Sequence, residues 1–151
     1  MALANKGCML HQKNQFQKHQ MGFDGEHVAM NALNKLGYKG IQTTSHKHTF
    51  DLLSGRTAFE VKALDPRAIH HQMGVSATQK AKKLAWAVAN KKKAKSVMVL
   101  MNDFAEVYIK GGVGKFRKGS MTKIARYDDW RLEVGAGRTD RLVESPLRPP
   151  P

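Results

Sequence analysis

Residues 49–63 read TFDLLSGRTAFEVKA, and this stretch decides the fold. Its apolar and polar residues alternate with a period of two, which is typical of β-strands that have one buried face. Ser54 and Gly55 interrupt the alternation and predict a tight turn. We therefore expect an antiparallel hairpin whose two strands cover residues 49–53 and 57–63.

Three charged side chains interrupt the apolar pattern of this hairpin. Glu60 and Lys62 are two residues apart in one strand, so they share a face of the sheet, and their apolar neighbours fill the other face. If the turn has two residues at 54–55, Asp51 lies opposite Ala58 and on the same face as Glu60. A three-residue turn would instead put Asp51 on the wrong face.

Two carboxylates and an ammonium group in an apolar hairpin need partners, because burying unpaired charge is costly. Carboxylate oxygens suit Mg²⁺ or Mn²⁺, which take one or two protein carboxylates and keep several waters. Such an ion polarises a phosphate and activates a water, and a neighbouring lysine can orient that water. Asp51, Glu60 and Lys62 therefore favour phosphodiester hydrolysis. The alternative is an ordinary Glu-Lys pair on the polar face of an edge hairpin.

Helical periodicity flanks the hairpin on both sides. Asp24 can cap a first helix that ends at Gly37, and residues 38–45 predict a weak strand. Ser76 can cap a second helix that runs to about Lys93. The expected apolar positions are Val28, Ala29, Ala32, Leu33 and Leu36 in the first helix and Ala77, Ala81, Leu84, Ala85 and Val88 in the second.

The residues after the second helix extend the sheet. Residues 96–101 (SVMVLM) form a continuous apolar run, which is typical of a central strand covered on both faces. Residues 105–109 predict another strand, residues 111–119 a glycine-rich basic loop, and residues 122–134 one more strand and a turn. The order of helix, three strands, helix and strand, with a short β extension, predicts an α/β or α+β fold with a mixed sheet flanked by helices.

The composition indicates a polyanionic partner. The chain carries 26 Lys and Arg residues against 12 Asp and Glu, a net charge of +14. Nucleic acid is the first candidate, and an anionic membrane surface or an acidic protein are the alternatives. Cys8 is the only cysteine, and we find no signal peptide and no bilayer-length apolar run, so we expect a cytoplasmic protein without a membrane contact. We expect a basic arm at residues 1–22, one domain at 23–144 and a Pro-rich tail at 145–151.

Charged residues outside the hairpin extend the predicted site. Glu26 lies at the edge of the first helix's apolar stripe and projects toward the sheet, while a favourable charge in the first turn is the alternative. Basic residues of the second helix and of the glycine-rich loop are expected to bind nucleic-acid phosphates: Lys80, Lys83, Lys91, Lys92, Lys93, Lys115, Arg117 and Lys118. The histidines at 46, 48, 70 and 71 have no zinc-site spacing, and Trp86 is expected in the core.

The stretches GEHVAMNALNKLGYKG, HTFDLL and TAFEVKAL resemble the PD-(D/E)XK nuclease superfamily, which includes restriction endonucleases, archaeal Holliday-junction resolvases and many phage nucleases. The resemblance covers residues 24–101 and implies a restriction-endonuclease-like αβββαβ core. It implies that Asp51 and Glu60 are metal ligands, that Lys62 is the catalytic lysine, and that Glu26 is the first-helix acid of the resolvase-like branch. Phe50 stands where the motif has its proline, so the resemblance rests on short motifs.

The resemblance implies a Mg²⁺-dependent endodeoxyribonuclease, with Mn²⁺ as a substitute ion and with DNA as its partner. It permits structure specificity, a homodimer and a phage origin, in which case the host cytoplasm is the location. Some branches place a Gln or Lys of the second helix at the site, and Gln79 and Lys80 are the candidates here, with a solvated side chain as the alternative. A non-catalytic nucleic-acid-binding protein and a small toxin-like RNase remain open as functions.

Overall fold

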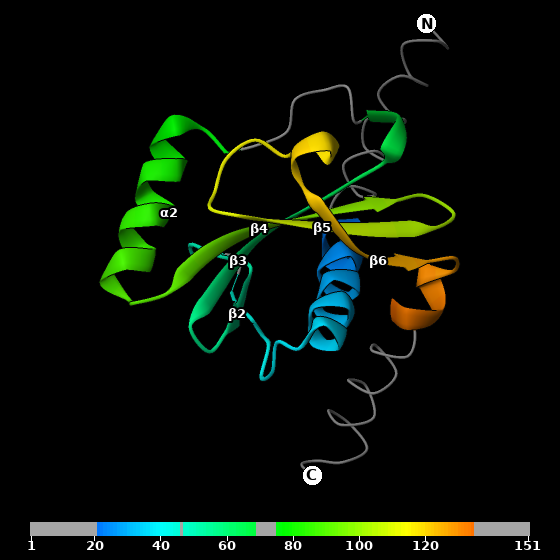
Figure 1. The fold of residues 1–151 in the computed structure, drawn as a ribbon, viewed down its shortest axis with the longest axis horizontal. Coiled ribbons are helices and arrows are strands. Elements are labelled where there is room, and N and C mark those ends of the chain that lie inside the picture. The colour runs from blue at the N-terminus through cyan, green and yellow to red at the C-terminus, as the bar shows by residue number, and fades with distance from the viewer. Residues whose placement is uncertain (1–20, 46, 69–74, 135–151) are drawn as a thin grey trace, which may run out of the picture.

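The computed structural model describes residues 21–45, 47–68 and 75–134. A six-stranded mixed sheet lies at its centre, and its strands follow one another in chain order (Figure 1). β3 and β4 are parallel, whereas the other neighbouring strands are antiparallel. The strands are β1 (Gln42–Thr43), β2 (Leu52–Ser54), β3 (Thr57–Leu64), β4 (Lys93–Met101), β5 (Ala105–Gly111) and β6 (Thr122–Tyr127). The predicted α/β class and mixed sheet are therefore confirmed.

Helices complete the predicted order of elements. Residues 21–36 are helical, and α2 (Ala77–Ala89) connects the parallel strands β3 and β4. Two short 3-10 helices, η1 (Pro66–Ala68) and η2 (Lys118–Ser120), follow β3 and precede β6. No helix in the described ranges is long and apolar enough to cross a membrane.

The 21–36 helix (blue in Figure 1) packs on one face of the sheet. Its predicted stripe is buried except for Leu36, which is 51% exposed. Asp24 is buried inside the helix, so the prediction that Asp24 is its N-cap is wrong. The prediction of an arm that extends to residue 22 is also wrong, because residues 21 and 22 are helical. Met21 explains the difference, because it continues the apolar stripe at helical spacing and packs against the core. Gly37, with φ of +122°, follows the last helical residue as predicted.

α2 begins as predicted and ends earlier. The Ser76 hydroxyl accepts a hydrogen bond from the Gln79 amide, which caps the helix. The helix ends at Ala89, because Lys91 has a positive φ of 54° and Lys93 already opens β4. The prediction of a helix that continues to about Lys93 is therefore wrong.

α2 turns a different side to the sheet than its periodicity predicts. Ala87 is its buried residue, whereas Leu84 and Val88 from the predicted apolar side are 38% and 80% exposed. The ring of Trp86 packs against Phe50, with 5.5 Å between the ring centroids. A large aromatic ring offers more apolar area than an alanine-rich stripe, and this side therefore faces the protein.

The alternation of side chains divides β3 and β4 into two faces. Phe59 and Val61 belong to the apolar cluster beneath the 21–36 helix. Glu60 lies between them in β3 and pairs in register with Ser96 of β4, which in turn pairs with Lys110 of β5. These three residues therefore form a row across the opposite face, the face of the sheet on which α2 packs.

The C-terminal half contains the predicted central strand and one unexpected helix. β4 is buried from residue 96 to residue 101, as expected for a strand covered on both sides. Residues 130–134 are helical where only a turn was predicted, and the Trp130 indole donates a hydrogen bond to the Asn102 carbonyl. The predicted tail, and the arm before residue 21, lie outside the described residues.

Candidate active site

In the β2–β3 hairpin the side chains lie on the predicted faces of the sheet, but the two strands pair in a different register. Residues 55–56 form its turn, one residue later than predicted, and Gly55 has a positive φ of 52°. The pairing consequently shifts by two residues, so that Leu53 and not Asp51 pairs with Ala58. Asp51 lies just before β2, and the Glu60 carboxylate is close enough to raise its pKa. Asp51 and Glu60 are therefore neighbours in spite of the error in the turn.

Asp51 is held by the backbone of β3. Its Oδ2 accepts a hydrogen bond of 2.8 Å from the amide of Val61, and its own amide donates to the carbonyl of Phe59 at 3.0 Å. Burial raises the pKa of Asp51 to about 6, with the adjacent Glu60 carboxylate as the second cause, against the lowering effect of the Val61 amide and of two lysines. A raised carboxyl pKa with a like-charged neighbour is typical of functional sites.

Glu60 lies between two lysines. Its Oε2 is 2.9 Å from Nζ of Lys83, and its Oε1 is 3.6 Å from Nζ of Lys62. The side chain of Glu60 is only 6% exposed, and that of Lys83 is 13% exposed. The ammonium group of Lys83 also donates to the carbonyl of Thr49 and lies over the ring of Phe50. Lys83 is thus fixed at the site, whereas Lys62, at 36% exposure, reaches toward solvent.

Lys83 is a site residue that the sequence prediction placed only among the phosphate contacts. The candidates from the second helix were Gln79 and Lys80, and of these Gln79 lines the cavity beside Glu60. A usable signal existed in Trp86, which is three residues from Lys83 and therefore on nearly the same side of the helix. Taking the large aromatic residue as the marker of the inward side would have selected Lys83.

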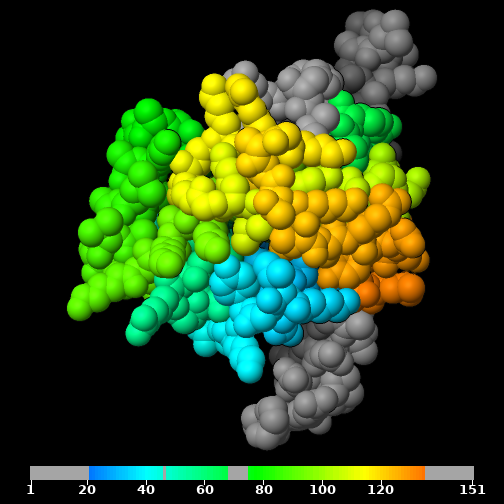
Figure 2. Space-filling model, viewed as in Figure 1, coloured from blue at the N-terminus to red at the C-terminus, as the bar shows by residue number. Residues whose placement is uncertain are grey.

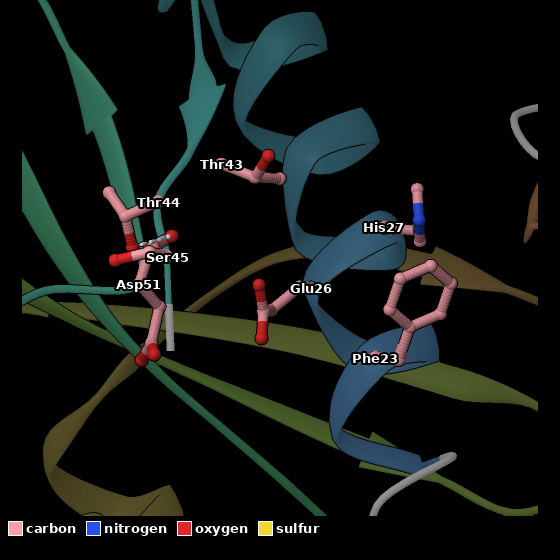
Figure 3. Close-up of a pocket in the computed structure, with 7 residues that line it drawn as sticks. All are labelled: Phe23, Glu26, His27, Thr43, Thr44, Ser45 and Asp51. Carbon is pink, nitrogen blue, oxygen red and sulfur yellow. Dashed lines mark hydrogen bonds between the residues drawn. The ribbon is translucent and has the colours of Figure 1, made fainter. Parts of the chain in front are cut away.

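Glu26 lies across a cavity of about 250 Å³ from Asp51. Figure 3 shows its carboxylate extending from the 21–36 helix toward the segment that carries Thr44 and Asp51. Gly25 allows the helix to approach here, because a Cβ at this position would lie 2.4 Å from the Cβ of Ala63. The close approach of the helix to β3 thus sets Glu26 at the cavity that Asp51 also lines. The cavity is also lined by Phe23, His27, Thr43 and Ser45.

A second cavity of about 470 Å³ opens at Glu60 and Lys62. His48 lies in its wall, with its ring edge-on to Trp86 at 5.0 Å and its Nδ1 accepting the amide of Phe50. Trp86 was predicted to be a core residue. It packs against Phe50, but it also lines this cavity. The other lining residues are Lys47, Thr49, Gln79, Lys82 and Lys83. The histidines at positions 46, 70 and 71 lie outside the described residues.

The other predicted phosphate contacts occupy two places. Lys92 donates to the carbonyl of Gly55 at 2.5 Å, which puts the Lys91–Lys93 segment at the turn end of the hairpin. That end is three residues along β3 from Glu60, about 10 Å at the usual rise of a strand. Lys115, Arg117 and Lys118 belong to the segment between β5 and β6, where Lys118 lies over the ring of Tyr108.

The oxygen donors at the site suit a hard divalent cation. Asp51 and Glu60 supply two facing carboxylates, which is the number that Mg²⁺ usually takes, with waters and substrate oxygens as its other ligands. Within the ranges that the structure describes, no group of three or more His, Cys, Asp and Glu side chains gathers as a metal cluster. The carboxylates of Asp51 and Glu60 are thus the residues at this site that could hold a divalent cation.

Comparisons of the chain with protein-family models, curated proteins and solved structures found no match. The resemblance of three short motifs to the PD-(D/E)XK superfamily therefore stays a prediction. Because a fold by itself does not define an activity, the function has to be argued from the chemistry of the site.

Proposed function

We propose that the protein is a metal-dependent nuclease that hydrolyses phosphodiester bonds of DNA. The observation that carries the proposal is the proximity of Asp51 to Glu60, whose charge raises the pKa of Asp51, with the ammonium groups of Lys62 and Lys83 around Glu60. The net charge of +14 supports a polyanionic substrate. A protein that only binds polyanions has no use for two facing carboxylates, which would repel its ligand.

Asp51 and Glu60 are the residues that would hold Mg²⁺, with Mn²⁺ as a substitute. A bound ion of this kind polarises a phosphate and lowers the pKa of a coordinated water. The amide of Val61 orients the Asp51 carboxylate and favours its ionised form, which is the form that binds a cation. Glu26 lies across the smaller cavity from Asp51 and offers a further carboxylate near that residue.

Lys62 and Lys83 have different roles in the proposal because Lys62 is the more exposed and Lys83 is the more firmly held. Lys83 is only 13% exposed and is held by Glu60 and by the Thr49 carbonyl, so it is a positioning residue that orients the Glu60 carboxylate. Lys62 is more exposed and its ammonium lies 3.6 Å from Glu60, which leaves it able to contact substrate in the larger cavity. There it orients the attacking water or stabilises the charge that develops on the phosphate.

The direct test is cleavage by the purified protein of plasmid, linear duplex, branched DNA and RNA, each with Mg²⁺ and with a chelator. We expect cleavage of DNA that requires Mg²⁺ and that falls by about three orders of magnitude in Glu60→Gln and in Asp51→Asn. Glu106→Gln is the matched control, because Glu106 is also a poorly exposed acid paired with basic residues, Lys123 and Arg126, on another part of the sheet. The control should keep full activity.

Two results would overturn the proposal. Cleavage that persists in both Glu60→Gln and Asp51→Asn would remove the acidic pair from the mechanism. DNA binding without cleavage of any substrate, under all metal conditions, would make the protein a non-catalytic nucleic-acid-binding protein. Cleavage of RNA alone would keep the site and change the substrate.

A further inference from the structure

Two ammonium groups from different elements converge beside Gly114, and a third cation, Arg117, lies near one of them. A Cβ built on Gly114 would lie 3.8 Å from Nζ of Lys80, on α2, and 3.8 Å from Nζ of Lys110, on β5. Apart from the residues adjoining Gly114 in the chain, no other described residue has a heavy atom within 4 Å of that position. The two ammonium groups therefore border the space beside Gly114, and the Lys110 ammonium also donates a hydrogen bond to the carbonyl of Lys115. Burial lowers the pKa of Lys110, and the nearby charges of Lys80 and Arg117 lower it further.

The cluster of Lys80, Lys110 and Arg117 lacks a carboxylate in the described part of the chain. The ion pairs found there join other residues, as in the pairs of Glu60 with Lys62 and Lys83. Like charges held together repel one another, and an anion that binds between them relieves the repulsion. The cluster thus has the composition of an anion site.

The position of the cluster relates it to the acidic pair. Lys110 stands in the same row across the sheet as Glu60, two strands away, which is about 10 Å at the usual spacing of strands. α2 lies between them, with Lys83 directed to Glu60 and Lys80 to the segment that follows β5. Figure 2 shows α2 (green) and this segment (yellow) side by side on the surface.

We propose that Lys80, Lys110 and Arg117 bind one backbone phosphate of a nucleic acid strand, at a site separate from Asp51 and Glu60. The separation of about 10 Å between the two sites is short enough for phosphates of one nucleic acid strand, a few nucleotides apart at most, to contact both. The inference rests on nucleic acid as the ligand, as in the proposed function, but it does not require cleavage. Gly114 leaves the space for the phosphate oxygens open.

Binding in chelator tests this site independently of catalysis. The affinity for a fluorescent DNA oligonucleotide is measured at several salt concentrations for the triple variant Lys80→Gln, Lys110→Gln, Arg117→Gln. The matched control removes three exposed cations elsewhere, with Lys35→Gln, Lys39→Gln and Arg56→Gln. Log affinity falls with log salt, and each neutralised phosphate adds about 0.7–0.9 to the steepness of that fall. We therefore expect the dependence on salt to become less steep, by about one, in the cluster variant and to stay unchanged in the control. Equal changes in both triple variants would overturn the site.

Two substitutions of Gly114 test whether charge at this position, and not shape, controls binding. Gly114→Asp introduces a carboxylate between the ammonium groups in the place of the phosphate, whereas Gly114→Asn introduces the same shape without charge. We expect the Asp variant to bind the oligonucleotide at least tenfold more weakly than the Asn variant. Equal affinities, in proteins whose unfolding midpoints show that both are folded, would contradict the proposal.

Inorganic phosphate distinguishes the source of the anion. At equal ionic strength, phosphate should raise the unfolding midpoint of the wild-type protein more than chloride does, and Lys80→Gln should reduce that difference. If phosphate has this effect while the cluster variant keeps the full salt slope for DNA, the site takes free phosphate and the assignment to a nucleic acid backbone is wrong. Loss of both effects in the variants supports the backbone phosphate.

Discussion

The two faces of β3 assign different tasks to adjacent residues. Phe59 and Val61 are buried beneath the 21–36 helix in the apolar core, whereas Glu60 and Lys62 turn to the face on which α2 packs. At these four positions one face of β3 packs in the core, and the other carries two charges beside the apolar contacts of α2. Substitutions on the two faces should therefore have different effects. Those on the core face should lower stability, and those on the charged face should lower cleavage.

The largest expected effect is the loss of cleavage in Lys62→Ala. Because the ammonium group acts on the reacting phosphate or water, its removal should lower turnover by about 10²–10⁴-fold, measured under single-turnover conditions. Lys62→Arg should restore little, since a planar guanidinium does not replace a compact ammonium group. Mg²⁺ affinity should be unchanged in Lys62→Ala, and a loss of that affinity would instead identify Lys62 as a structural partner of Glu60.

Phe59→Ala tests the opposite face of the same strand. Phe59 is fully buried, so its truncation should lower the free energy of unfolding by about 3–5 kcal/mol, measured by urea denaturation. Cleavage per folded molecule should change little below the unfolding transition. A large loss of turnover in folded Phe59→Ala would show that the two faces are not independent.

Asp51 links the charged face to stability through its pKa. Its pKa is raised from 3.8 to about 6 in the folded protein, so the folded protein holds the Asp51 proton more tightly than the unfolded chain does. The resulting contribution to stability is complete below pH 3.8 and is lost as the pH rises through 6. At pH 8 ionised Asp51 therefore lowers stability by on the order of 2–3 kcal/mol. Without metal, Asp51→Asn should unfold at a higher temperature than wild type at pH 8, and the difference should shrink toward pH 4. A variant that is less stable at pH 8 would identify Asp51 as a stabilising ion-pair partner.

Gly25 tests whether the approach of the helix sets the position of Glu26. Gly25→Ala puts two Cβ atoms 2.4 Å apart, and the forced shift should cost about 1–3 kcal/mol and lower cleavage. Ala63→Gly removes the opposing Cβ and should restore part of both losses in the double variant, where the nearest remaining atoms are at 3.5 Å and 3.6 Å. If the two losses add without coupling, the contact does not position the helix.

Much of the hairpin was predictable because apolar and charged residues alternate from Phe59 to Ala63 and a Ser-Gly pair marks the turn. The turn was misplaced by one residue, since Gly55 fits a turn at residues 54–55 as well as at 55–56. The pairing moved by two residues, an even number, so the side chains of β2 kept their predicted faces, and Asp51 still lies near Glu60.

The faces of α2 were less predictable. Alanines occupy both its inner and its outer side, so its periodicity carries little signal, and the packing of Trp86 decides the orientation. The convergence of Lys80 with Lys110 joins a helix and a strand thirty positions apart. Such a long-range contact leaves no local pattern in a single sequence.

The most direct test of the central claim, a divalent cation site at Asp51 and Glu60, is the response of the unfolding midpoint to Mg²⁺ at pH 8. Because the ion binds the folded site and not the unfolded chain, the midpoint of the wild-type protein should rise with Mg²⁺ concentration. In Asp51→Asn the midpoint should start higher and should hardly respond. A wild-type midpoint that ignores Mg²⁺, together with an Asp51→Asn variant that melts earlier, would contradict the metal site and leave a basic protein whose carboxylates are structural.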